Sequence, residues 1–235
     1  MKQIHPIQIQ ILKKLLFAPE LRYSDLRPDL IIENNQLDFH LDKLVLHGWV
    51  TKKGASYHLT SSGKEYADRI DTDRNLITKQ AKVSAWIAST RQSRKDKQFL
   101  IYTRLKQPFF GCQGFLGGKI RFGEKIIEAA EREFTEETGL HGKAAIVSLK
   151  HFRIFDKSSK ALVADKFMFL CLVKNPTGAL LSENIEGKYE WVNMKDLKTY
   201  LTNPFEPLSE TMGFVQEIEK FSGVTTIKEV DHYTK

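Results

Sequence analysis

Two hydrophobic patterns follow one another along this chain of 235 residues. In the first seventy residues, isoleucine and leucine recur three and four positions apart, as on the buried face of an amphipathic helix. This spacing predicts a helix around Ile7–Leu16 and a short helix capped by Ser24. A third helix is predicted from Asn34 or Asn35 to His47. Beyond residue 80, alternating and continuous apolar runs predict strands instead.

A hairpin and a further helix complete the first pattern. Two alternating runs flank a Lys-Gly turn between Trp49 and Thr60, and such a pair predicts a β-hairpin. Thr60 then caps a helix that runs to about Ile70. Since residues 71–75 are polar, we expect the boundary there. The predicted organisation is a first domain over 1–72, a linker over 73–78, a second domain over 79–222 and a C-terminal tail over 223–235.

The second domain mixes strands with helices. Strands are predicted over 82–90, 97–105, 144–155, 165–173 and 190–192, and helices over 124–138, 194–201 and 209–221. This order predicts an α/β fold, in which helices cover both faces of a mixed sheet. The sequence has no apolar run of about 18 residues, so no membrane span is predicted.

The most informative chemistry lies in residues 118–140, which read GKIRFGEKIIEAAEREFTEETGL. Alanine, glutamate and lysine favour a helix here, and Gly139 ends it because glycine adopts a left-handed backbone without strain. At roughly 100° per residue, Glu133, Glu136 and Glu137 fall within an arc of about 100°. A solvated acidic helix would explain these three glutamates alone. Like charges this close destabilise a bare helix, however, so we expect a divalent counter-cation, Mg²⁺ or Mn²⁺.

A basic, glycine-rich loop precedes this helix. Gly118 lets the backbone approach a ligand closely, and a helix N-terminus favours anions. Lys119 and Arg121 add positive charge to the same loop. The predicted substrate-binding residues are therefore Gly118, Lys119, Arg121 and Arg104.

The spacing G-x5-E-x7-R-E-F-x-E-E-x-G-L within 118–140 resembles the Nudix box, and residues 79–222 resemble the Nudix hydrolase family more loosely. The resemblance implies a Nudix α/β/α sandwich with a mixed sheet. It also implies Mg²⁺- or Mn²⁺-dependent hydrolysis of the pyrophosphate bond in a nucleoside diphosphate linked to another moiety. The implied metal ligands are Glu133, Glu136, Glu137 and the carbonyl of Gly117. One departure from the family pattern is Leu116, where many members have proline.

Many members of the family supply a late acidic residue from a loop before a tryptophan-containing strand. Ahead of Trp191 the candidates are Glu183, Glu186 and Glu190, and we favour Glu186 because it lies in a loop-like stretch beside Gly187. Arg132 is expected to pair with a glutamate and orient it. The predicted catalytic residues are therefore Glu133, Glu136, Arg132 and Glu186.

The order of helices and hairpin in residues 3–72 resembles a winged helix-turn-helix domain, whose third helix usually reads the DNA major groove. Here that helix region carries Glu33, Asp38 and Asp42 against Lys43 alone. The candidate DNA contacts are Asn34, Asn35 and Gln36 for bases and Lys52 and Lys53 in the wing. Fold does not establish function, so DNA binding and a protein-contact or dimerisation role both remain open.

The net charge of +7 belongs mostly to the second domain. Residues 1–75 hold 11 Lys and Arg against 10 Asp and Glu, whereas the remainder holds 25 against 19. This excess suits an anionic nucleotide substrate. Cys112 and Cys171 do not make a disulfide framework, and the N-terminus is too polar for a secretory signal, so we expect a cytoplasmic protein. A homodimer is compatible with both predicted domains.

Two functions follow from these patterns. The first is a pyrophosphohydrolase that acts on a nucleoside triphosphate, ADP-ribose or a nucleotide sugar. The second is a transcriptional regulator, in which the Nudix domain senses a nucleotide and the winged helix binds DNA. Regulators that pair these modules often have an eroded catalytic box, so the intact Glu133, Glu136 and Glu137 set favours the enzyme.

Overall fold

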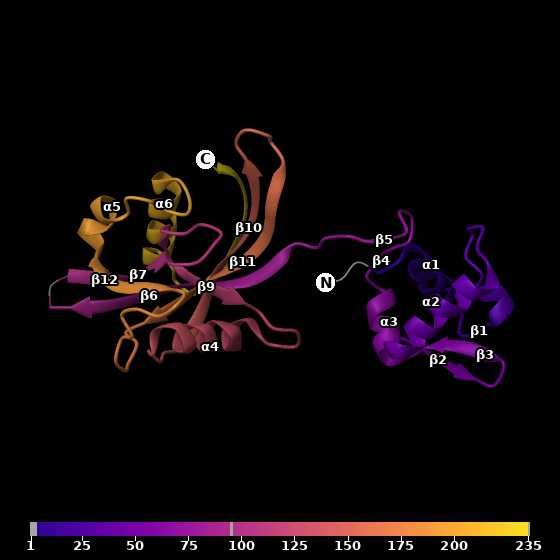
Figure 1. Cartoon of the computed structure of the whole chain (residues 1–235). Helices are drawn as coiled ribbons and strands as arrows, with labels where there is room; N and C mark the ends of the chain where they lie inside the picture. The colour runs from indigo at the N-terminus through magenta and orange to yellow at the C-terminus, as the bar shows by residue number, and fades with distance from the viewer. Residues whose placement is uncertain (1–3, 95, 235) are drawn as a thin grey trace. The chain divides into compact units, whose positions relative to one another are not determined.

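The chain consists of two compact units in a computed structural model, residues 1–80 and residues 81–235 (Figure 1). The structure describes residues 4–94 and 96–234. Each unit has its own hydrophobic core, so each is considered by itself.

The helices of the N-terminal unit follow the predicted pattern closely. They are α1 (Pro6–Leu16), the 3-10 turn η1 (Tyr23–Leu26), α2 (Asn34–Leu46) and α3 (Ser61–Ala67). The apolar positions that predicted α1 and α2 are buried; Ile11, Leu12 and Leu37 have no exposed surface. His5 caps the start of helix α1, because its ring Nδ1 accepts the Ile7 N–H at 3.3 Å.

A small sheet completes the N-terminal unit. The hairpin is present as β2 (Val50–Lys53) and β3 (Ser56–Leu59), with β1 (Leu21–Arg22) on the other side of β3. Helix α3 ends at Ala67, earlier than predicted, because β4 (Ile70–Asp71) pairs with β5 (Leu76–Ile77). The segment expected to be a linker therefore contributes a strand.

Close packing fixes the start of α3. The Gly63 N–H donates to Thr60 Oγ1 at 3.0 Å, as expected of a capping threonine. A Cβ atom at Gly63 would lie 1.8 Å from the carbonyl oxygen of Trp49. Only glycine fits this approach without moving the backbone.

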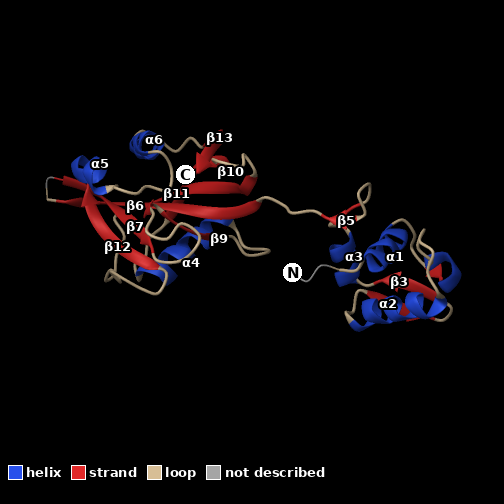
Figure 2. Cartoon of the chain, turned by 45° about the horizontal axis from the view of Figure 1, so that its top comes forward, coloured by secondary structure: helices blue, strands red, loops and turns tan. Residues whose placement is uncertain are grey.

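The C-terminal unit is built on a mixed sheet, which Figure 2 shows in red. Its strands are β6 (Lys82–Ser93), β7 (Asp96–Arg104), β8 (Gln113–Gly114), β9 (Leu116–Lys119), β10 (Ala144–Asp156), β11 (Leu162–Lys174), β12 (Gly187–Asn193) and β13 (Thr226–Thr234). The order is β12-β7-β6-β11-β10-β13, with β8 paired to β7 and β9 paired to β6. The β6–β11 and β10–β13 pairs are parallel and the other pairs are antiparallel.

Helices cover both faces of this sheet, so the predicted α/β/α sandwich is confirmed (Figure 1). Helix α4 (Ile126–Thr138) packs on one face through Ala130 and Phe134. The opposite face carries η2 (Met194–Asp196), α5 (Leu197–Tyr200) and α6 (Leu208–Glu219), and buries Trp86 against Phe214. Among the described residues, no helix combines the length and the apolar character needed to cross a membrane.

Two features of this unit were not predicted. Residues 223–235 were expected to form a tail, but they contribute β13, which runs parallel to β10. Pairing with a strand seventy residues away decides this structure, and local sequence does not reveal it. The second feature is a buried ion pair: Lys150 is 1% exposed, and its Nζ lies 2.7 Å from Glu217 on α6.

Candidate active site

The helix of the acidic segment begins at Ile126, two residues later than predicted. Glu124 does not continue it, because its carboxylate folds back onto the preceding loop and accepts the Arg121 N–H at 2.9 Å. The end of the helix is as predicted: Gly139 has a φ of 70° and its N–H donates to the Thr135 carbonyl at 2.9 Å. The loop and the helix are therefore joined at the start of α4 through Glu124.

Arg132 is the centre of a charged network on α4. Its guanidinium donates to Glu124 at 2.6 Å, to Glu133 at 2.7 Å and to Glu136 at 3.1 Å. It also donates to the Lys119 carbonyl at 3.2 Å. Hydrogen bonding to Arg132 lowers the pKa of Glu124, and the same bonds raise the pKa of Arg132. The expected pairing of Arg132 with glutamate is thus present, and it orients two of the predicted ligand residues.

Gly118 allows Glu133 to reach the strand that carries the glycine pair. A Cβ atom at Gly118 would lie 1.9 Å from the Glu133 Cδ and 2.1 Å from its Oε2. The neighbouring Gly117 pairs with Trp86 in the β9–β6 ladder, and a Cβ there would lie 3.0 Å from the Ala85 carbonyl. Gly118 therefore lets the Glu133 carboxylate lie close to strand β9.

Glu137 is a half-buried carboxylate near the C-terminal end of α4. Tyr189 donates its hydroxyl hydrogen to Glu137 Oε2 at 3.0 Å, and Asn184 donates to the Glu137 carbonyl at 3.0 Å. Burial raises the pKa of Glu137 to about 7, and the negative charges of Glu133 and Glu186 add to this rise. A carboxylate held in this environment is stabilised by an added cation.

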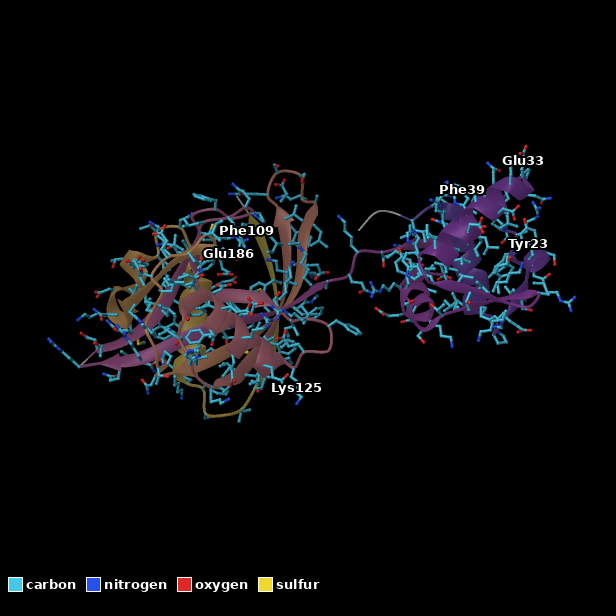
Figure 3. The ribbon with its side chains drawn as sticks, turned by 60° about the horizontal axis from the view of Figure 1, so that its bottom comes forward. Tyr23, Glu33, Phe39, Phe109, Lys125 and Glu186 are labelled. Carbon is cyan, nitrogen blue, oxygen red and sulfur yellow. The ribbon has the colours of Figure 1, made fainter. Side chains whose placement is uncertain are left out.

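Glu186 approaches the site from the loop before β12. Asn184 Oδ1 accepts the Glu186 N–H at 2.8 Å and the Gly187 N–H at 3.0 Å, which fixes a tight turn. The Tyr102 hydroxyl donates to the Glu186 carbonyl at 3.1 Å, and the Glu186 carboxylate pairs with Lys106. Glu186 is labelled in Figure 3.

The two other late acidic candidates have different partners. Glu183 pairs with Lys188 at 3.2 Å, and Glu190 accepts a hydrogen bond from the Tyr200 hydroxyl. Asn184 links Glu186 to α4, because its Oδ1 accepts the Glu186 N–H and its Nδ2 donates to the Glu137 carbonyl. The structure thus brings Glu186 together with the carboxylates of α4.

The carboxylates suit a divalent cation, although they are not already arranged around one. Within residues 4–94 and 96–234, no three His, Cys, Asp or Glu side chains form a ready ligand cluster. Arg132 draws Glu133 and Glu136 towards itself, and Lys106 draws Glu186. The mutual repulsion of Glu133, Glu137 and Glu186 is nevertheless the arrangement that a hard cation relieves, and carboxylate oxygens are its preferred ligands.

The predicted substrate-binding residues lie around this network. The Lys119 side chain is exposed, while Arg121 Nη2 lies 3.4 Å from Glu136 Oε1. Arg104 donates to the carbonyls of Lys106 at 2.9 Å and Pro108 at 2.7 Å. Arg104 therefore organises the loop after β7, which carries Lys106 to Glu186.

Sequence reasoning missed the residues that hold Glu137 and Glu186. Tyr189 is fully buried in β12, and Asn184 closes the turn before it. An Asn followed three residues later by a glycine is a turn signal that could have indicated Asn184. The role of Tyr189 depends on a contact across 52 positions, so no local pattern reveals it.

The predicted DNA contacts lie on the surface of the N-terminal unit. Asn34, Asn35, Gln36, Lys52 and Lys53 are all exposed. Two of them have structural partners: Asn34 accepts a hydrogen bond from Arg27, and Gln36 caps the Glu33 N–H. The exposed surface of α2 also presents Phe39, 57% exposed and labelled in Figure 3, and Leu46, 76% exposed.

Comparison with known proteins identifies relatives of the C-terminal unit. A family model described as NUDIX domain matches residues 80–211. An ADP-ribose pyrophosphatase of Methanocaldococcus jannaschii is 34% identical over 87 residues, which cover 37% of this chain and 52% of that protein. An uncharacterized Nudix hydrolase of Bacillus subtilis, YvcI, is 30% identical over 97 residues, 40% of this chain and 59% of that protein. The chain thus spans little more than half the length of these curated relatives.

A solved structure agrees with the fold. The NUDIX domain of Shewanella oneidensis NrtR, complexed with ADP ribose, has a TM-score of 0.50 against this chain at 14% sequence identity. The match covers 69% of this chain and 98% of that one. At this identity the likeness shows a shared fold.

Proposed function

This chain belongs to the Nudix domain family, and we propose that it hydrolyses the pyrophosphate bond of a nucleoside diphosphate linked to another moiety. The observation that supports this most is the half-buried Glu137, whose charge is disfavoured by burial and by Glu133 and Glu186. A carboxylate with a raised pKa beside other carboxylates is typical of a functional site. ADP-ribose is the first substrate to test, because one relative is an ADP-ribose pyrophosphatase.

We infer that Glu133, Glu136 and Glu137 would hold Mg²⁺ or Mn²⁺, with the Gly117 carbonyl as a further oxygen donor. When bound, such a cation neutralises the diphosphate and lowers the pKa of an attacking water. Neighbouring side chains hold these glutamates in position. Arg132 holds Glu133 and Glu136, and Tyr189 holds Glu137.

We assign proton acceptance from the attacking water to Glu186. It belongs to the loop before β12 and lies outside the Arg132 network. Glu137 also lies outside that network, but its carboxylate accepts a hydrogen bond from the Tyr189 hydroxyl. Lys106 pairs with the Glu186 carboxylate and holds it in place. Lys119 and Arg121 supply positive charge for the phosphates at the start of α4, where backbone N–H groups also favour anions.

The test is turnover of nucleoside triphosphates, ADP-ribose, dinucleotides and nucleotide sugars with Mg²⁺ or Mn²⁺, beside the Glu137→Gln and Glu186→Gln variants. We expect AMP and ribose 5-phosphate from ADP-ribose, and loss of turnover in Glu137→Gln. A Glu186→Gln variant should lower kcat by about a hundredfold or more, as expected for loss of a general base. An unaltered kcat would assign the base elsewhere, and no turnover of any compound would exclude the hydrolase.

For the N-terminal unit we propose a protein-contact role. The exposed surface of α2 combines Phe39 and Leu46 with the acidic Asp38 and Asp42, whereas phosphate binding requires several Lys or Arg contacts. We expect no salt-sensitive shift of sheared DNA in an electrophoretic assay at low ionic strength. A shift that the Lys52→Ala and Lys53→Ala changes weaken would support the regulator instead.

A further inference from the structure

Three buried polar atoms near the start of α6 have no hydrogen-bond partner in the described part of the chain. They are Glu206 Oε2, Glu210 Oε2 and Thr211 Oγ1, and the whole Thr211 residue is 2% exposed. Buried polar atoms are nearly always paired in folded proteins, so three within six residues call for an explanation. None of them takes part in the carboxylate network of α4.

A lysine from the sheet shares this region: Lys166 Nζ lies 5.5 Å from the Phe109 ring, and Phe109 contacts Phe205, the residue before Glu206. Burial lowers the pKa of Lys166 on β11, and the positive charges of Lys82 and Arg104 lower it further, while Glu206 opposes the shift. The attraction between Lys166 and Glu206 therefore acts without a hydrogen bond to Glu206 Oε2. Lys166 Nζ can donate a hydrogen bond and Glu206 Oε2 can accept one, but the two atoms are not hydrogen-bonded to each other.

An aromatic side chain lies beside this lysine. Lys166 Nζ is 5.5 Å from the centroid of the Phe109 ring, and Phe109 meets Phe205 edge to face at 6.4 Å. Phe109 has a φ of 71°, a conformation that costs free energy for a residue with a side chain. Such a residue beside unpaired polar groups is typical of a ligand site.

Hydrogen bonds join this region to the candidate active site. Arg104 holds the loop of Phe109 through the Pro108 carbonyl and also donates to the Tyr102 hydroxyl at 3.4 Å. Tyr102 in turn donates to the carbonyl of Glu186. The loop after β7 thus carries both Phe109 and Lys106, and Lys106 pairs with Glu186 at the candidate active site. Figure 3 labels both Phe109 and Glu186 in this unit.

We propose that Glu206 and Lys166 recognise the edge of an adenine base, with Phe109 against the ring face. This inference rests on the proposed function, since it concerns the nucleoside of the same substrate. Adenine presents an exocyclic N–H donor beside a ring-nitrogen acceptor. Glu206 Oε2 accepts from the amine and Lys166 Nζ donates to the ring nitrogen.

The test is binding of AMP and of purine riboside 5′-monophosphate, which lacks the amine, to the full chain by isothermal titration calorimetry at pH 8, where the Glu206 carboxylate is ionised. We expect the wild-type protein to bind AMP at least tenfold more tightly, since a hydrogen bond to a charged group contributes roughly tenfold or more. Glu206→Ala should bring this ratio close to one. Glu206→Gln keeps an acceptor oxygen and should retain part of the preference, while the exposed Glu65→Ala should leave the ratio unchanged.

Equal binding of the two nucleotides by the wild-type protein, or no binding of AMP, would overturn the proposal. So would a preference that survives in Glu206→Ala. The wild-type comparison changes the ligand alone, so it does not depend on how a variant folds. Binding needs no turnover: hydrolysis without an amine preference would reject this inference alone, and an amine preference without hydrolysis would reject the proposed activity alone.

Discussion

The two units of this chain place their charged residues differently. In the Nudix unit Arg132 is 16% exposed and contacts three carboxylates, and Glu137 is half-buried beside Tyr189. In the N-terminal unit the core is apolar, and the polar candidates, such as Asn35 and Lys52, are exposed. Burying a charge costs free energy unless it is paired. Buried charge therefore indicates a site, whereas exposed charge on α2 and the hairpin does not separate DNA binding from protein contact.

The largest expected effect comes from neutralising the half-buried carboxylate. Glu137→Gln should lower kcat/KM on the substrate identified by the panel by about a thousandfold or more, because an electrostatic ligand at the reacting centre contributes several kcal/mol. The amide oxygen can still accept from Tyr189, so thermal unfolding should change little. If Glu137→Gln kept a tenth of the wild-type turnover, Glu137 could not be assigned to the active site.

A second effect concerns pH. Burial raises the pKa of Glu206 to about 7 from 4.5, with Glu210 adding to the rise and Lys166 opposing it. Between these values the folded state keeps a proton that the unfolded chain has released, so stability falls as pH rises. The proton on Glu206 contributes ~3 kcal/mol to the free energy of unfolding at low pH, and this contribution is lost by about pH 8.

Denaturant unfolding of wild type and Glu206→Gln between pH 4 and 8 checks this. The free energy of unfolding of Glu206→Gln should rise relative to that of wild type as pH rises. Glu65→Gln, which changes an exposed glutamate of the N-terminal unit, should show no such pH-dependent difference from wild type. Parallel pH profiles for Glu206→Gln and wild type would show that Glu206 ionises normally.

The third prediction separates geometry from charge. Gly118→Ala puts a methyl group where the Glu133 carboxylate lies, so turnover should fall about a hundredfold, an effect typical of small displacements at a reacting centre. Gly213→Ala is the matched control, because a Cβ there meets no atom within 4 Å. Equal steady-state rates for the two variants would contradict the close approach of Glu133 to Gly118.

The smallest effect should fall on the other unit. Gly63→Ala forces a Cβ against the Trp49 carbonyl, and overpacking of this kind costs about 1–3 kcal/mol. Unfolding of the N-terminal unit should occur at lower denaturant, with turnover unchanged within about twofold. A parallel loss of activity would show that the Nudix unit depends on its N-terminal neighbour.

The sequence predicted what depends on local spacing. The arc of Glu133, Glu136 and Glu137 follows from helical periodicity, and Gly139 ends the helix because only local backbone conformation matters there. The start of α4 was placed two residues early, since Glu124 prefers the Arg121 N–H and Arg132 to the helix. This competition involves a partner eight positions away.

The parts that were missed depend on contacts between distant residues. Tyr189 meets Glu137 because β12 lies beside β7 in the sheet, and β13 pairs with β10 across more than seventy positions. Periodicity carries no information on which strands become neighbours. The unpaired oxygen of Glu206 is likewise visible once α6 and the loop of Phe109 are placed against β11.

The contact between Gly118 and Glu133 affects how the activity of related sequences is predicted. A chain that keeps all three glutamates but carries any larger residue at the second glycine would still score as a complete set of acidic ligands. Its first carboxylate would have no room beside the strand. Such paralogues are expected to turn over their substrate about a hundredfold or more slower, so this glycine marks an active copy better than the number of glutamates does.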